Sequence, residues 1–205
     1  MQEVAKRTLD LVVALVAVAL LLPILISVAI LVKLTSPGPV FYRGVRTARY
    51  GGEFRIFKFR TMVVNAERLG GTTTGQNDAR LTSIGKTLRD FKLDELPQLF
   101  NVIFGDMSLV GPRPEVEEYT SQFTQEEQRI LSVRPGITDL SSLKFHDLQS
   151  HVGGEDPDKV FRERILPQKN ALRLQYVDTR SFWGDIAILW QTFWVIATRP
   201  LRRAS

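Results

Sequence analysis

Residues 11–32 read LVVALVAVALLLPILISVAILV, an apolar run in which Ser27 carries the only polar side chain. About 20 apolar residues cross the hydrocarbon core of a bilayer, so this run has the length of a membrane helix. A cleavable signal peptide has a shorter apolar region followed by small residues at a cleavage site. Here the chain continues with KLTSPGP, residues 33–39, which lacks that pattern. We therefore expect a retained membrane anchor.

Basic residues flank this anchor on both sides. Lys6 and Arg7 precede it, and residues 33–60 after it are strongly basic. Basic residues near membrane segments tend to stay on the cytoplasmic side, and a helix that enters and returns on one face satisfies both flanks. Pro23, near the middle of the run, removes a backbone hydrogen bond and crowds the carbonyl one turn earlier. A re-entrant helix broken at Pro23 is therefore favoured, with a spanning helix that tolerates the proline as the alternative.

The chain has 205 residues, which suits a membrane element at residues 1–36 and one domain at residues 37–205. It has no cysteine, which excludes disulfides and thiolate chemistry, and we expect its two histidines, His146 and His151, in loops without a metal role. The net charge of +5 suits an anionic partner. The basic residues accompany glycine and proline turns rather than a recognition helix, so nucleic acid is not expected.

Local patterns after the anchor predict a helix-rich α+β domain with a short sheet. Residues 54–60, FRIFKFR, alternate apolar and basic side chains, which predicts a strand with one face on the core and a row of cations on the other. We expect one helix over about residues 82–91 and a second between Pro97 and Gly105. Pro97 suits the first turn of a helix, and Gly105 suits a C-terminal cap.

Two later segments carry helix-start signals. Thr124 and Glu127 have the spacing of a capping box, which opens a short helix that ends before residue 135. Asp156 and Pro157 begin another helix, which we expect Pro167 to interrupt.

The C-terminal region predicts an amphipathic helix at the membrane surface. Residues 186–198 carry no charge but are too short to span a bilayer. Tryptophan prefers the headgroup region, and basic residues that follow would contact an anionic leaflet. An ordinary core helix is the alternative. The apolar residues at helical spacing are Ile186, Leu189, Trp190, Phe193 and Ala197. The nearby tryptophans are Trp183 and Trp194, and the arginines that follow are Arg199, Arg202 and Arg203.

Asp94 and Glu95 are adjacent carboxylates just before the helix predicted at Pro97. At a helix entrance two such side chains can diverge, so that one attacks phosphorus while the other holds a divalent cation such as Mg²⁺. The positive end of the helix favours an ionised Asp94 and an incoming anion. Taken alone, the dipeptide also fits a solvated helix cap.

Basic residues in segments rich in glycine and proline surround this pair in the sequence. Guanidinium groups donate two parallel hydrogen bonds to phosphate, and prolines on both sides of Arg113 fix the origin of its side chain. The pattern predicts a diphosphate site. Its candidate residues are Lys58, Arg60, Arg80, Arg89, Arg113 and Arg134.

Four motifs occur in order along the chain: KFRTM at residues 58–62, LDELPQ at 93–98, GDMSLVGPRP at 105–114 and RPGIT at 134–138. Together they closely resemble the bacterial sugar transferase family, the monotopic polyprenyl-phosphate phosphoglycosyl transferases. The resemblance extends from Lys6 to the C-terminal aromatic helix, and the chain is similar to the minimal form of the family, without additional N-terminal membrane helices.

The resemblance implies a ping-pong reaction. Asp94 would attack the phosphate next to the sugar in a UDP-sugar, releasing UMP. A polyprenyl phosphate, expected to be undecaprenyl phosphate, would then accept the phosphosugar, giving a polyprenyl diphosphate sugar in the first membrane step of glycoconjugate assembly. Glu95 would carry Mg²⁺. Family positions that line the phosphate site are matched by Arg60, Arg89 and Arg113, with Lys58 and Arg134 as further candidates.

The resemblance also implies a re-entrant N-terminal helix at the cytoplasmic face of the bacterial inner membrane. Membrane lipid is then a partner, and a second copy of the chain or a downstream glycosyltransferase is a further candidate. Two departures stand out. Leu22 precedes Pro23 where serine is frequent, and Asp139-Leu140 follow RPGIT where Gly-Trp is frequent, which leaves the sugar open. A non-catalytic anchor that binds nucleotide sugars is the rival hypothesis, since it has no need for Asp94 and Glu95.

Overall fold

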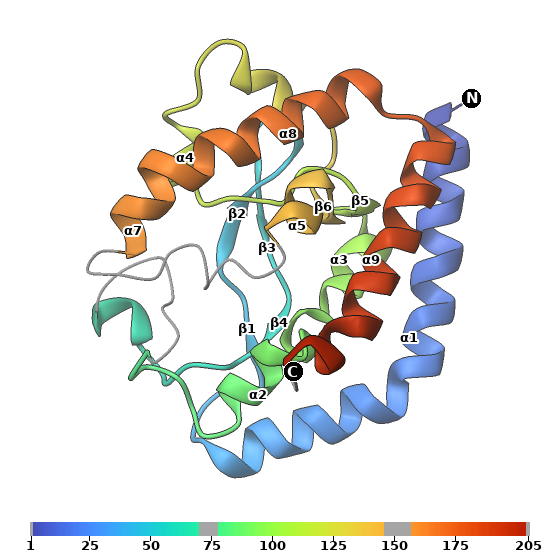
Figure 1. Ribbon diagram of the computed structural model, residues 1–205. Coiled ribbons are helices and arrows are strands. Elements are labelled where there is room, and N and C mark those ends of the chain that lie inside the picture. Colours follow the sequence, from blue (N-terminus) through green and yellow to red (C-terminus); the bar gives the residue numbers. More distant parts are fainter. Residues whose placement is uncertain (1, 70–77, 146–156, 204–205) are drawn as a thin grey trace.

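The computed structural model describes residues 2–69, 78–145 and 157–203 (Figure 1). His146 and His151 lie outside these residues. The described chain is helix-rich with very short strands, as expected for the α+β class. Its helices are α1 Gln2–Thr35, α2 Gly85–Asp90, α3 Gln98–Phe104, α4 Glu117–Thr120, α5 Leu140–Lys144, α7 Pro157–Val160, α8 Leu166–Thr179 and α9 Phe182–Arg203. Short 3₁₀ segments are η1 Arg49–Gly51, η2 Ala66–Leu69, η3 Leu93–Glu95 and η4 Glu127–Ser132, and η5 Phe161–Ile165 is a π-helical turn.

The strands form three separate pairs in the described chain rather than one short sheet. β1 Phe41–Tyr42 pairs antiparallel with β4 Lys58–Phe59, and β2 Val45–Thr47 pairs antiparallel with β3 Glu53–Arg55. β5 Ser108–Val110 pairs in parallel with β6 Gly136–Thr138. The last pair brings two of the sequence motifs side by side.

The single strand predicted over residues 54–60 is wrong in detail, because it is divided between β3 and β4. The side chain of Asn101 enters the break, where its Oδ1 accepts a hydrogen bond from Phe57 N (2.8 Å) and its Nδ2 donates one to Arg55 O (2.9 Å). The expected row of exposed cations also fails at Arg60, which is buried. A side chain more than 40 residues away therefore decides this strand break.

Helix α1 contains Pro23 in its interior, and Figure 1 shows the helix bending part-way along its length. One stripe of the helix is buried against the rest of the chain: Asp10, Ala14, Leu25, Val28 and Val32. Most of its other apolar side chains are exposed. Among the described helices, only the segment Glu3–Thr35 is long and apolar enough to cross a membrane by length and composition. An apolar surface of this extent beside a packed stripe is typical of a helix in contact with lipid.

The two ends of α1 contact the same domain. At the N-terminal end, Arg7 donates from Nη1 to Val102 O (2.7 Å) and from Nη2 to Ile103 O (3.1 Å), which caps the C-terminal carbonyls of α3. At the other end, Arg60 donates to Ser36 O (2.9 Å) and to Pro39 O (2.6 Å). The basic residues on both flanks are therefore used to attach α1 to the domain.

The remaining helices agree with the sequence signals to different degrees. Helix α3 follows Pro97 and ends at Gly105, whose φ of 96° is left-handed, as expected for a C-terminal cap. The capping box is confirmed, since Thr124 N donates to Glu127 Oε2 (2.9 Å) and Glu127 N donates to Thr124 Oγ1 (3.2 Å). That box opens the 3₁₀ segment η4 rather than an α-helix.

Two predicted helix boundaries require correction. Helix α2 begins at Gly85 rather than near Thr82, because Thr82 forms a turn with Gly85 and bonds to Thr61 O (3.0 Å). Pro167 does not interrupt the helix that begins at Pro157. The chain passes through the π-turn η5, and Pro167 then lies in the first turn of α8, where a missing N–H is tolerated.

Helix α9 lies beside the N-terminal half of α1 in Figure 1. It buries Asp185 and Ile188 against the domain. Trp183, Trp190 and Trp194 are instead exposed, together with Phe193. The aromatic side chains predicted for a membrane-surface helix are therefore on the outside of the molecule.

Candidate active site

Asp94 and Glu95 lie in η3, the turn that leads from α2 into α3. Lys92 precedes this turn, and its φ of 58° is left-handed and uncommon for a residue with a Cβ atom. The pair therefore lies at a helix entrance, as the sequence predicts, but it is not a solvated cap. Asp94 is only 6% exposed, and the Glu95 side chain only 16%.

Glu95 is held by two cations from separate elements. Its Oε1 accepts a hydrogen bond from Lys58 Nζ in β4 (3.1 Å) and another from Nη2 of Arg113, which follows β5. Burial by itself would raise the pKa of Glu95, but Arg113 and Lys58 outweigh it and hold that pKa well below its usual range. Burial also lowers the pKa of Lys58, against the opposing effect of Glu95. Glu95 is therefore a firmly ionised carboxylate.

Asp94 is in a different electrostatic state. Burial and the neighbouring charge of Glu95 raise its pKa, while Lys58, Lys92 and Arg89 act in the opposite direction. Among the described residues, no group donates a hydrogen bond to Asp94 Oδ1, although this atom is buried. A buried carboxylate oxygen without a partner is costly, and such atoms are frequent at catalytic centres. Asp94 therefore has an acceptor oxygen ready for a ligand.

Arg113 is fixed from three directions. Its Nη1 donates to Ile137 O (3.1 Å) in β6, and its backbone N–H donates to Asp139 Oδ2 (3.2 Å). The strand pair behind it needs glycine, because a Cβ atom on Gly136 would collide with the backbone of Gly111. The RPGIT and GPRP motifs therefore run in close backbone contact, and this contact aims Arg113 at Glu95.

The other predicted phosphate ligands differ in their surroundings. Arg89 contributes positive charge at Asp94, and its Nε donates to Thr61 Oγ1 (2.9 Å). Arg60 uses Nε and Nη2 on the carbonyls that follow α1, and within the described chain its buried Nη1 has no acceptor. Arg80 pairs with Asp78.

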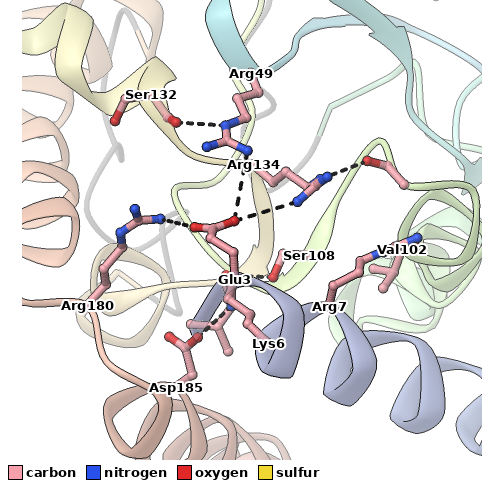
Figure 2. A network of polar contacts seen from close by, with 12 residues as sticks. Glu3, Lys6, Arg7, Arg49, Val102, Ser108, Ser132, Arg134, Arg180 and Asp185 are labelled. Carbon is pink, nitrogen blue, oxygen red and sulfur yellow. Dashed lines mark hydrogen bonds and ion pairs between the residues drawn. The ribbon is translucent and has the colours of Figure 1, made fainter. Parts of the chain in front are cut away.

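Arg134 is not placed with Asp94 and Glu95. Its Nε donates to Gly105 O (3.2 Å), and its Nη1 lies 3.9 Å from Glu3 Oε2 in a separate cluster at the start of α1 (Figure 2). The structure thus brings together Lys58, Arg89 and Arg113 around the pair, holds Arg60 at the end of α1, and puts Arg134 elsewhere.

Sequence reasoning did not assign a role in the geometry of the site to three residues that shape it. Asp139 is fully buried and bonds to the backbone of Arg113. Thr61 orients Arg89, and Asn101 fixes the break before Lys58. Thr61 lies within KFRTM, and Asn101 lies between LDELPQ and GDMSLVGPRP, so a signal for both residues existed. Nothing in the sequence pattern distinguished burial from exposure at Asp139.

Residues 1–199 match the sequence profile of the family described as bacterial sugar transferase. The chain belongs to this family. The match covers the apolar helix α1, the carboxylate pair and the GPRP and RPGIT motifs. The similarity to bacterial sugar transferases therefore extends over nearly the whole chain.

Curated relatives support the same assignment. A protein of Aeromonas hydrophila named UDP-N-acetylgalactosamine-undecaprenyl-phosphate N-acetylgalactosaminephosphotransferase is 35% identical over 196 residues, 94% of this chain and 44% of its own length. Two proteins named UDP-glucose:undecaprenyl-phosphate glucose-1-phosphate transferase are also similar. That of Caulobacter vibrioides is 37% identical over 93% of this chain and 68% of its own length, and that of Escherichia coli 36% over 91% and 39%. The chain thus spans less than half of two of these relatives and about two thirds of the third.

Proposed function

We propose that this chain transfers a sugar 1-phosphate from a UDP-sugar to polyprenyl phosphate, with undecaprenyl phosphate as the acceptor. Support comes from the relatives, whose names specify UDP-sugars and undecaprenyl phosphate. The observation that carries the proposal is Asp94, whose Oδ1 is buried without a hydrogen-bond partner in the described chain, beside an ionised Glu95 and three basic side chains. This arrangement suits a carboxylate nucleophile facing a diphosphate.

The reaction has two displacements at one phosphorus atom. In the first, an oxygen of ionised Asp94 forms a bond to the phosphorus next to the sugar, and the bond to the other phosphate breaks, so that UMP leaves with the electron pair. In the second, a phosphate oxygen of the polyprenyl phosphate attacks the same phosphorus, and Asp94 leaves as a carboxylate. The products are UMP and a polyprenyl diphosphate sugar, and Asp94 is regenerated.

The basic residues have different roles in the proposed reaction. Lys58 and Arg113 orient Glu95 and offer further N–H donors to the diphosphate, while Arg89 supplies positive charge close to Asp94. These charges stabilise the negative charge that accumulates as UMP leaves. Lys58 and Arg89 also act to lower the pKa of Asp94, although burial and the charge of Glu95 outweigh them.

Asp94 and Glu95 would suit a Mg²⁺ ion whose remaining ligands come from the substrate. The described residues contain no group of three or more carboxylate, histidine or cysteine side chains, so a cage made by the protein alone is not available there. Mg²⁺ is commonly bound through one or two carboxylates plus phosphates and water, and the orphaned Asp94 Oδ1 next to Glu95 offers such a pair. Glu95 would hold the ion, which when bound neutralises diphosphate charge.

The contacts of α1 support the proposed mode of membrane attachment. Lys6 and Arg7 at one end, and the carbonyls of Ser36 and Pro39 at the other, contact one domain. A helix that crossed the bilayer would place these ends on opposite sides. We therefore propose a re-entrant helix at the cytoplasmic face of the bacterial inner membrane, where UDP-sugars are available. The exposed tryptophans of α9 suit the headgroup layer beside it.

Substitution Asp94→Asn tests the covalent mechanism. Purified protein in detergent is incubated with a panel of UDP-sugars, polyprenyl phosphate and Mg²⁺, and UMP release is recorded. We expect the variant to lose at least about a thousandfold in rate, since the amide is not a nucleophile. The matched control is Asp178→Asn, which makes the same change in an exposed ion pair with Arg129 and should keep its activity. Unchanged UMP release by Asp94→Asn would leave the rival hypothesis of a non-catalytic anchor.

The same variant also provides its own folding control. The folded-state pKa of Asp94 is raised, so this carboxyl favours the folded state below its unfolded pKa and loses that contribution as pH rises through the folded pKa. Removing the charge at neutral pH therefore should not destabilise the fold. We expect the melting temperature of Asp94→Asn to equal or exceed that of the unsubstituted protein.

A further inference from the structure

Three arginines from distant parts of the chain converge on one carboxylate at the start of α1 (Figure 2). Arg180, between α8 and α9, donates from Nη1 to Glu3 Oε1 (2.9 Å). Nη1 of Arg49 and Nη1 of Arg134 each lie 3.9 Å from Glu3 Oε2. The last two distances are ion pairs without a hydrogen bond. Glu3 therefore only partly satisfies the cations around it.

Arg49 and Arg134 are held in position by contacts other than Glu3. Arg49 Nε donates to Ser132 O (2.8 Å), and Arg134 Nε donates to Gly105 O (3.2 Å). With each Nε bound to a carbonyl, the terminal nitrogens face the same place from two sides. A phosphate group is wider than a carboxylate and accepts paired hydrogen bonds from guanidinium, so it fits this spacing better than Glu3 does.

The surroundings leave an excess of positive charge. Lys6 pairs with Asp185 (2.5 Å), and Asp10 accepts a hydrogen bond from Leu109 N (3.1 Å). Arg7 is bonded to carbonyl oxygens, which carry no net charge. Five of the eight charged side chains are therefore basic: Lys6, Arg7, Arg49, Arg134 and Arg180 against Glu3, Asp10 and Asp185.

The position of the cluster suits a membrane surface. Glu3 precedes the apolar run by about 12 Å along the helix axis, and by less in depth if the helix is tilted. Trp183 is 77% exposed close to Arg180 in the chain, and Tyr50 is 75% exposed with Arg49 over its ring at 4.6 Å. Tryptophan and tyrosine prefer the headgroup level of a bilayer. If α1 is embedded as proposed, the arginines lie level with phospholipid phosphates.

We propose that Arg49, Arg134 and Arg180 form a binding site for the phosphodiester headgroup of an anionic membrane phospholipid. Glu3 occupies the site when lipid is absent, and the headgroup displaces it. The site rests on the proposed membrane attachment and is separate from Asp94 and Glu95. Its occupation would hold the N-terminal end of α1 and the start of α9 against the same leaflet.

Native mass spectrometry of the full chain tests the site. The protein is released from micelles that contain either phosphatidylglycerol or phosphatidylcholine, and the retained lipid is quantified. We expect preferential retention of phosphatidylglycerol. Arg134→Gln and Arg180→Gln should each reduce that preference about fivefold, the effect of one basic residue at an anionic surface. Arg162→Gln, in an exposed pair with Glu118 of α4, is the matched control. Figure 1 shows α4 on the side of the molecule away from α1.

Glu3→Gln gives the decisive result. Removal of this carboxylate leaves the three guanidinium groups uncompensated, so retention of phosphatidylglycerol should rise severalfold. A folding defect cannot produce such a gain. Equal retention by Glu3→Gln and the unsubstituted protein would show that the cluster is only an ion-pair clamp and overturn the proposal. Displacement of the lipid by millimolar inorganic phosphate would assign the site to the free anion instead.

The lipid measurement is independent of catalysis. A protein that retains phosphatidylglycerol as expected but releases no UMP would contradict the proposed function and leave the lipid site intact. The opposite outcome, with full UMP release and no lipid preference, would overturn the lipid site alone.

Discussion

At the residue scale, Asp139 holds the loop of Arg113 beside the candidate active site. It is fully buried, and its carboxylate accepts hydrogen bonds from Arg113 N (3.2 Å), Ser142 N (2.6 Å) and Ser141 Oγ (2.8 Å). Arg173 Nε lies 3.8 Å away. The carboxylate therefore caps α5 and anchors the loop of Arg113 together. The departure from the frequent Gly-Trp sequence supports the geometry of a basic residue at the site.

Lys169 provides a pH-dependent prediction close to this cluster. It is buried beside Glu115, with a separation of 3.8 Å, and burial lowers its pKa to about 8. The unfolded chain keeps this proton up to about pH 10.4. Between about pH 8 and 10 the unfolded state thus binds more protons, and stability rises with pH. We expect this rise to be smaller in Lys169→Met, as measured by denaturant unfolding from pH 7 to 10.

Parallel pH profiles for Lys169→Met and the unsubstituted protein would contradict that prediction. Glu115 keeps its hydrogen bond from Arg173 Nη2 (2.6 Å) in the variant, so the substitution does not leave an unpaired buried charge. Lys159→Met, at an exposed position on α7, serves as the control for loss of a lysine.

Residue type and motif membership could identify the basic residues but could not separate their roles. Arg113 reaches Glu95, whereas Arg60 bonds to the carbonyls after α1 and Arg134 faces Glu3. All three are arginines within the quoted motifs KFRTM, GDMSLVGPRP and RPGIT. The difference depends on which distant carbonyl or carboxylate lies within reach, and this is a property of the tertiary fold.

At the element scale, the parallel pair of β5 and β6 depends on two glycines. Gly111 N donates to Thr138 O (3.0 Å), and Gly136 N donates to Pro112 O (3.0 Å). We expect Gly136→Ala to destabilise the protein by about 3 kcal/mol and to raise KM for the UDP-sugar, because the new Cβ would separate the strands that position Arg113. Melting curves and UMP-release kinetics measure the two effects.

Gly52→Ala is the matched control for that substitution. The φ of Gly52 is −69°, and a Cβ there would have its nearest neighbour at 3.8 Å, so the change should be tolerated. If the Gly136→Ala and Gly52→Ala variants have the same melting temperature, close strand contact at Gly136 is not required.

Elements with local signals were predictable, whereas those set by distant contacts were not. Pro97, Gly105 and the box of Thr124 with Glu127 mark their boundaries correctly because each signal acts within one turn. The strand break before Lys58 was missed, because it requires Asn101. The continuation of the helix past Pro167 was also missed, because the π-turn before it places Pro167 in the first turn of α8.

At the scale of the whole molecule, the attachment of both ends of α1 predicts a specific labelling pattern. The chain has no cysteine, so single cysteines can be introduced without background. Val4 and Leu34 are 71% and 78% exposed near the two ends of the helix, and Leu20 is 75% exposed close to Pro23. We expect an impermeant maleimide to label Val4→Cys and Leu34→Cys only from the cytoplasmic side, while Leu20→Cys resists from both sides.

Inside-out and right-side-out vesicles make this measurement directly. Labelling of Val4→Cys from the periplasmic side would establish a spanning helix and contradict the re-entrant topology. Denatured samples of each variant, labelled in detergent, control for the intrinsic reactivity of each thiol.

The capping of α3 by Arg7 has a consequence for how the acceptor is reached. Helix α3 has seven residues, a length of about 10 Å, and it connects the carboxylate turn to its own C-terminal carbonyls, which Arg7 binds. If α1 is embedded as proposed, this connection fixes the distance of Asp94 from the bilayer surface. The proposed lipid phosphate acceptor would then react while it remains in the leaflet. Turnover should then follow the mole fraction of acceptor in the bilayer rather than its total concentration in the assay.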